Sequence, residues 1–169
     1  MNVSENFKSI ELQLRETVNG HNISTLPNVI AVTKYVTIDR ANDAYNAGIR
    51  HFGENRIEGF YQKQQALPKD VTMHFIGALQ TRKVKEVIND VDYFHALDRL
   101  KLAKEINKRA THTIKCFVQV NVSGEASKQG VTLDELDTFI EELAQFDNIE
   151  VVGLMTMAPL TDDESYIKG

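Results

Sequence analysis

Short apolar runs alternate with amphipathic segments along most of the chain, and this alternation limits the folds that it can adopt. The apolar runs have the length and composition of buried strands, and the segments between them repeat apolar residues at helical spacing. Strands that alternate with helices over short connections predict parallel β/α units. We expect strands at 29–33, 50–53, 72–76, 91–96, 114–121 and 149–156.

Helical segments fill the intervals between the expected strands. The clearest covers 133–146, whose apolar residues recur at the spacing of one helix face. An additional helix precedes the first strand, with Ser4 as its expected cap and Gly20 as its expected end. Thr161 is expected to cap a last helix, which continues to the end of the sequence. The remaining helices are expected at 38–47, 55–66, 81–89 and 98–108.

Two parallel architectures are compatible with six strands. A doubly wound sheet can stop at six, whereas a (β/α)₈ barrel cannot close with them. The doubly wound fold predicts a glycine-rich phosphate turn after its first strand, but the sequence there is Thr33-Lys34-Tyr35-Val36-Thr37. The pattern therefore favours a single α/β domain over 1–169. We expect a parallel (β/α) barrel of the TIM type, incomplete at about six of eight units, with an extra N-terminal helix.

Composition excludes several classes of function. The 169 residues carry a net charge of −5, from 19 Lys and Arg against 24 Asp and Glu. This balance predicts no binding to nucleic acid or to anionic membranes. The polar, acidic start argues against a signal peptide, and no apolar run has membrane-spanning length. The single cysteine, Cys116, cannot form an internal disulfide, so a reducing cytoplasm is the expected compartment.

Lys34 is the most informative residue for function, because it follows the first expected strand at its carboxyl end. Parallel α/β proteins place their chemistry at that end of the strands. A lysine amine can form an imine with an aldehyde, above all with that of pyridoxal phosphate (PLP). A free lysine, with a pKa of about 10.4, is almost fully protonated at pH 7. The alternative is a structural lysine whose stem lies on Tyr35.

Other candidates near the strand ends also have structural interpretations. Asn55 can offer a neutral hydrogen bond to a ligand or cap the helix that follows it. His74 lies in a strand beside Gly77 and can equally be a core histidine satisfied by backbone groups. Cys116 is most simply a buried, inert thiol. No two histidines stand at i, i+4, and no metal-binding motif occurs, so we expect no metal site. The segment 124–130 lacks the order of a Walker motif and is expected to be a polar loop.

Five segments together resemble one known family. They are Val29-Ile30-Ala31-Val32-Thr33-Lys34, His51-Phe52-Gly53-Glu54-Asn55, His74-Phe75-Ile76-Gly77-Ala78-Leu79-Gln80, Gln119-Val120-Asn121-Val122-Ser123 with Ser127-Lys128-Gln129-Gly130, and Val152-Gly153-Leu154-Met155-Thr156-Met157. In this order they are similar to the pyridoxal phosphate homeostasis proteins of the YggS type. These proteins are relatives of the amino-terminal domain of alanine racemase. Each motif alone is weak evidence for the family, but five motifs in the family's order are very specific evidence.

The resemblance implies a barrel that carries PLP as a Schiff base on Lys34. Asn55 matches the family asparagine beside the cofactor, and His74, Gly77 and Met155 match residues of the surrounding pocket. Such proteins bind and buffer PLP and influence vitamin B6 and amino-acid balance, without robust catalytic turnover. No residue is therefore assigned a catalytic role. The alternatives are a racemase-like PLP enzyme and a fragment that no longer binds PLP.

The family chain is longer than this one. The resemblance implies two further β/α units, whose loops and an arginine hold the phosphate and the ring nitrogen, and no residue here matches them. The expectation is that the chain is a fragment. An incomplete barrel would expose strand edges, so self-association and weak or absent PLP binding are expected.

Overall fold

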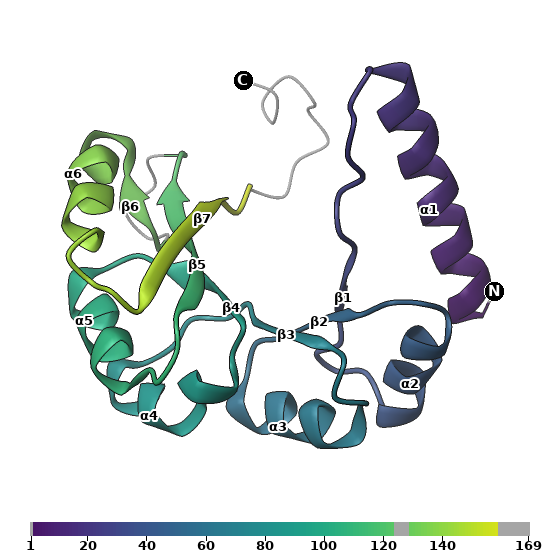
Figure 1. Ribbon diagram of the computed structural model, residues 1–169, viewed down its shortest axis with the longest axis horizontal. Helices are drawn as coiled ribbons and strands as arrows, with labels where there is room; N and C mark the ends of the chain where they lie inside the picture. The colour runs from purple at the N-terminus through teal and green to yellow at the C-terminus, as the bar shows by residue number, and fades with distance from the viewer. Residues whose placement is uncertain (1, 124–128, 159–169) are drawn as a thin grey trace. The chain divides into compact units, whose positions relative to one another are not determined.

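The computed structural model describes residues 2–123 and 129–158. The chain forms two compact units, one up to Phe75 and one from Ile76 onward. Apart from the first helix, the helices of each unit lie along one side of its parallel strands (Figure 1). Residues 124–128 of the loop expected at 124–130 lie outside the described residues, as does the helix expected from Thr161 onward. Whether 1–169 folds as a single domain stays a prediction.

The first unit contains three parallel strands. Its central strand, β2, pairs with both neighbours, so that Val32 lies opposite Gly53 and Gly53 lies opposite His74. All three strands were predicted to within three residues at each end. In chain order the elements are α1 (Val3–Gly20), β1 (Ile30–Val32), α2 (Ile38–Asn46), β2 (His51–Glu54), α3 (Ile57–Ala66) and β3 (Thr72–Phe75).

The start of α1 corrects one prediction. Asn2, and not Ser4, is the N-cap: the Glu5 backbone N–H donates to Asn2 Oδ1 at 2.8 Å, and the Asn2 N–H donates to the Glu5 carboxylate at 3.5 Å. This reciprocal arrangement is a capping box, which satisfies two N–H groups at the helix start. The helix ends at Gly20, as predicted.

Strand alternation gives β2 two different faces. Phe52 is fully buried and Glu54 is 2% exposed, and both lie on the face that α3 covers. His51 and Gly53 occupy the other face, because successive side chains of a strand point to opposite sides. Phe60 of α3 packs against Phe75, with ring centroids 6.1 Å apart. This unit therefore buries a carboxylate within an otherwise aromatic layer.

The second unit is organised around β5, which pairs in parallel with β4, β6 and β7. The two-residue strand β6 was not predicted, and the helix expected at 81–89 is a single α-turn between two 3₁₀ turns. The elements are η1 (Thr81–Lys83), α4 (Val84–Val87), η2 (Ile88–Asp90), β4 (Tyr93–Leu97), α5 (Leu100–Arg109), β5 (Ile114–Asn121), β6 (Val131–Thr132), α6 (Leu133–Leu143) and β7 (Ile149–Met155).

The core of the second unit is almost wholly apolar. Gly153 is required beside it, because a Cβ at that position would lie 2.8 Å from the Phe117 ring. Burial of such side chains is the main favourable contribution to folding. Side chains with no exposed surface include Phe94, Leu97, Leu102, Ile106, Ile114 and Val118.

Candidate functional site

Lys34 lies in a tight turn directly after β1. The Val36 N–H donates to the Thr33 carbonyl at 3.1 Å, which closes the turn over 33–36. Tyr35 has a φ of 65°, the left-handed conformation that a type II turn requires at its third position. A bulky residue rarely adopts this conformation, and its occurrence costs roughly 1–3 kcal/mol unless the surrounding structure enforces it. Lys34 is exposed at this strained turn.

Lys34 and Asn55 follow the ends of two paired strands, β1 and β2. Val32 pairs with Gly53, and the Thr33 N–H continues the ladder by donating to the Gly53 carbonyl at 3.0 Å. Lys34 comes two residues after Val32, and Asn55 comes two residues after Gly53. Both therefore follow the carboxyl ends of neighbouring parallel strands, as the sequence predicts.

Asn55 is half-buried and does not cap the following helix. The N-cap of α3 is Arg56, and this end has no side-chain cap hydrogen bond. The capping interpretation of Asn55 is therefore wrong. A role beside the cofactor stays a prediction for this amide.

His74 is 3% exposed and contacts a second histidine. Its Nε2 lies 2.9 Å from His51 Nδ1, so one ring donates a hydrogen bond and the other accepts it. The sequence analysis considered histidines at i, i+4, the spacing of one helix face. It therefore missed this pair, whose members lie on two different strands. The register could have revealed it, because His51 and His74 stand on the same face of adjacent strands, next to Gly53. His74 is therefore a buried histidine with a side-chain partner.

A buried ion pair contacts Thr33, the first residue of the turn, and the sequence analysis did not predict it. Lys63 Nζ of α3 donates to Glu54 Oε1 at 3.1 Å, and the two side chains are 5% and 2% exposed. Thr33 joins them, since its Oγ1 donates to the same carboxylate oxygen at 2.9 Å. The available signal was Glu54 on the same strand face as Phe52, because a buried carboxylate needs a partner.

The other two expected site residues, Gly77 and Met155, belong to the second unit. Gly77 is half-buried just before the 3₁₀ turn η1, and Met155 is the half-buried last residue of β7, opposite Gln119. Asn121 ends β5, and its Oδ1 accepts a hydrogen bond from Ser123 Oγ at 3.1 Å. A pocket made of Lys34, Asn55, His74, Gly77 and Met155 together stays a prediction.

Two titratable groups of the second unit are perturbed by burial. Desolvation lowers the pKa of His95, whose ring stacks on Phe117 with centroids 4.5 Å apart. Desolvation also raises the pKa of the Cys116 thiol to about 12. Cys116 is fully buried, which agrees with the prediction of an inert thiol.

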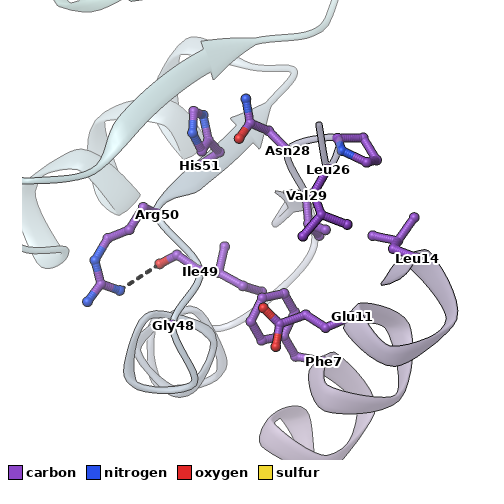
Figure 2. Close-up of a pocket in the computed structure, with 11 residues that line it drawn as sticks. Phe7, Glu11, Leu14, Leu26, Asn28, Val29, Gly48, Ile49, Arg50 and His51 are labelled. Atoms are coloured by element: carbon purple, nitrogen blue, oxygen red, sulfur yellow. Dashed lines mark hydrogen bonds between the residues drawn. The ribbon is translucent and has the colours of Figure 1, made fainter. Parts of the chain in front are cut away.

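A cavity of about 320 Å³ lies in the first unit, at the opposite end of the strands from Lys34. Figure 2 shows the side chains that line it. Phe7 and Leu14 of α1 face Val29 and Ile49, which precede β1 and β2. The cavity therefore lies at the amino ends of the strands, where parallel α/β folds do not place their chemistry.

The described residues offer neither a metal site nor a membrane-spanning helix. Among them, no cluster of three or more His, Cys, Asp or Glu side chains could hold a metal ion. None of the helices in this part of the chain is both long enough and apolar enough to cross a membrane.

Residues 13–168 match the alanine racemase N-terminal domain family. The pyridoxal phosphate homeostasis protein of Aquifex aeolicus is 34% identical over 170 residues, which cover 98% of this chain and 73% of that protein. The chain therefore belongs to the pyridoxal phosphate homeostasis protein family, as its motifs predict.

Solved structures confirm the predicted parallel β/α fold. PipY of Synechococcus elongatus, solved without PLP, superposes with a TM-score of 0.84 at 28% identity, over 99% of this chain and 76% of PipY. A second PipY structure, with PLP bound, gives 0.77 at 29% identity over 95% and 72%. Alanine racemase of Clostridium difficile shares the fold alone, with a TM-score of 0.69 at 14% identity over 83% and 41%.

Proposed function

We propose that this chain binds PLP as a Schiff base on Lys34 and serves PLP and amino-acid homeostasis without robust catalytic turnover. The observation that carries this proposal is the place of Lys34. Lys34 is exposed on a turn at the carboxyl end of β1, and Asn55 follows the carboxyl end of the neighbouring strand β2. PipY, a relative at 29% identity, has been solved with PLP bound, which supports the same ligand here.

The chemistry requires an accessible amine in its neutral form. The neutral Nζ of Lys34 attacks the PLP aldehyde carbon, a C=N bond forms, and the aldehyde oxygen leaves as water. The reaction is reversible, which suits a protein that stores and releases the cofactor. Asn55, His74, Gly77 and Met155 are proposed to surround the ring.

Borohydride reduction tests the proposal. The chain is incubated with PLP, reduced and digested, and the peptides are weighed. We expect a pyridoxyl mass on the Lys34 peptide, and its loss in Lys34→Ala. Lys8 on the exposed surface of α1 provides a matched control, because Lys8→Ala removes an exposed amine of a helix that does not follow the carboxyl end of a strand. Labelling spread evenly over exposed lysines, or absent from Lys34, would refute the proposal and favour a chain without specific PLP binding.

The same samples test the enzymatic alternative. Racemisation and transamination of a panel of amino acids are measured with PLP present. We expect no turnover above that of free PLP. Activity that disappears in Lys34→Ala would instead establish a racemase-like or other PLP-dependent enzyme.

We further propose that the chain self-associates through its strand edges. Within the described residues, β1 pairs only with β2, and β7 pairs only with β5. Both strands expose apolar side chains, with Val32 at 50% and Leu154 at 54%. Unpaired edges of this kind are templates for further strand pairing. A monomer by light scattering would refute this. A cytoplasmic location is proposed from the single cysteine.

A further inference from the structure

Three side chains of the first unit form a buried polar cluster behind the turn that carries Lys34. Glu54 Oε1 accepts hydrogen bonds from Thr33 Oγ1 at 2.9 Å and from Lys63 Nζ at 3.1 Å. Thr33, Glu54 and Lys63 are 3%, 2% and 4% exposed. Gly59 in the first turns of α3 makes room for the carboxylate, since a Cβ there would lie 2.9 Å from Glu54 Oε2.

The cluster holds the backbone of the turn as well as its own charges. Lys63 Nζ donates a second hydrogen bond, at 3.3 Å, to the Thr33 carbonyl. That carbonyl also accepts the Val36 N–H bond that closes the turn. The residue before Lys34 is therefore fixed through its N–H, its carbonyl and its hydroxyl. Such over-determination is what a strained φ at Tyr35 requires in order to persist.

Stability alone does not explain why charges are buried here. A buried ion pair often contributes no more than apolar residues of the same volume, because both charges lose their hydration. The benefit expected from such a pair is a fixed geometry. Its geometric effect in this unit is on the residue immediately before the amine that we propose binds PLP.

We propose that Glu54 and Lys63 are positioning residues, which act through Thr33 to hold Lys34 in the orientation that reacts with the aldehyde. This inference rests on the proposed function. Burial also separates the roles of the two lysines: Lys63 is enclosed and committed to Glu54 and Thr33, whereas Lys34 is exposed. The cluster thus directs the aldehyde to one amine and keeps a second, nearby amine out of reach.

The first test compares Thr33→Val with Thr33→Ser. Valine keeps the shape of threonine but removes the hydroxyl that donates to Glu54, and serine restores it. We expect Thr33→Val to slow PLP labelling of Lys34 about 10- to 100-fold, the effect of a reactive group displaced by about 1 Å, and Thr33→Ser to stay within a few-fold of wild type. Glu54→Gln and Lys63→Met should slow labelling in the same way.

Two further variants separate positioning from general loss of stability. Phe7→Leu weakens the contact of α1 with the cavity shown in Figure 2, and Asp70→Asn removes the exposed Arg50–Asp70 ion pair. Both changes lie away from the turn at 33–36, so we expect thermal stability to fall in Phe7→Leu with an unchanged labelling rate in each. Thr33→Val or Lys63→Met variants that label Lys34 at the wild-type rate would overturn the proposal.

Amide hydrogen exchange supplies a readout that does not depend on PLP. The Val36 N–H is protected by its bond to the Thr33 carbonyl. We expect its exchange to accelerate in Lys63→Met and Glu54→Gln but not in Asp70→Asn. If wild type shows no label on Lys34, the proposed function fails and the role in PLP binding fails with it, while exchange still decides whether the cluster holds the turn. Unchanged Val36 exchange would overturn that remaining part.

Discussion

The two units of the chain bury polar groups in different ways. In the first unit, Glu54 and Lys63 neutralise each other, and His74 contacts His51. In the second unit, burial itself dominates, since desolvation is the cause of the perturbed pKa of both His95 and Cys116. A buried ion pair fixes a geometry, whereas desolvation suppresses charge and, for a thiol, reactivity.

The first unit contains a buried ion pair, whereas the buried side chains of the second unit are almost all apolar. The first unit keeps charged groups next to the turn that carries Lys34. The second keeps apolar side chains such as Phe94 and Leu102 between its strands and helices. Four predictions follow from this difference between the units. They are given in order of decreasing expected effect.

Removing one partner of the buried ion pair should have the largest effect on stability. Lys63→Met leaves the Glu54 carboxylate buried without its cation, so we expect the free energy of unfolding to fall by about 3–5 kcal/mol. Urea denaturation measures this change. The double variant Glu54→Gln/Lys63→Met should recover most of the loss. A loss below about 1 kcal/mol, the value of an exposed ion pair, would show that the pair is not effectively buried.

Truncation in the apolar core of the second unit should cost slightly less. Leu102 of α5 has no exposed surface, and Leu102→Ala should lower the free energy of unfolding by about 2–5 kcal/mol through lost burial and a residual cavity. Leu102→Met, which nearly conserves volume, should cost less than about 1.5 kcal/mol in the same urea titration. Equal losses in the two variants would contradict a close-packed apolar core.

Lowering the pH should reduce the stability of the folded chain through protonation of His95. Its pKa is lowered in the folded protein, so as the pH falls through about 6.5 the unfolded chain binds the proton first and stability decreases. The decrease ends below the folded pKa, and no effect is expected above about pH 7. Thermal unfolding of wild type and His95→Gln between pH 5 and 8 should show a shallower slope in the variant. Identical slopes would assign the acid sensitivity to other groups.

The smallest expected effect concerns the Cys116 thiol. It should react with a thiol reagent only when the core opens, and it should make no difference to stability. With a pKa of about 12, roughly one thiol in ten thousand is ionised at pH 8, against about a quarter for an ordinary cysteine. A thiol reagent should therefore label the native chain very slowly and the urea-unfolded chain at once. Rapid native labelling would mean that β5 is accessible without unfolding.

Much of the fold was predictable because the spacing of apolar residues along the sequence indicates which side of a helix or strand is buried. Strand β5 was predicted at its observed bounds, and Lys34 and Asn55 were correctly expected after neighbouring parallel strands. The short strand β6 was missed because two residues carry no periodic signal. The cap of α1 was misplaced because Asn2 and Ser4 are both good N-cap residues, and only the geometry distinguishes them.

The amino-acid sequence by itself determined the parallel β/α pattern, the family and the lysine proposed to bind PLP, because strand periodicity and ordered motifs are local properties. Only the tertiary structure decided that Glu54 meets Lys63 behind that lysine and that His51 meets His74. These contacts depend on strand register and on the packing of α3 over β2. Register and packing are settled by the burial of many side chains together, so no single stretch of sequence encodes them.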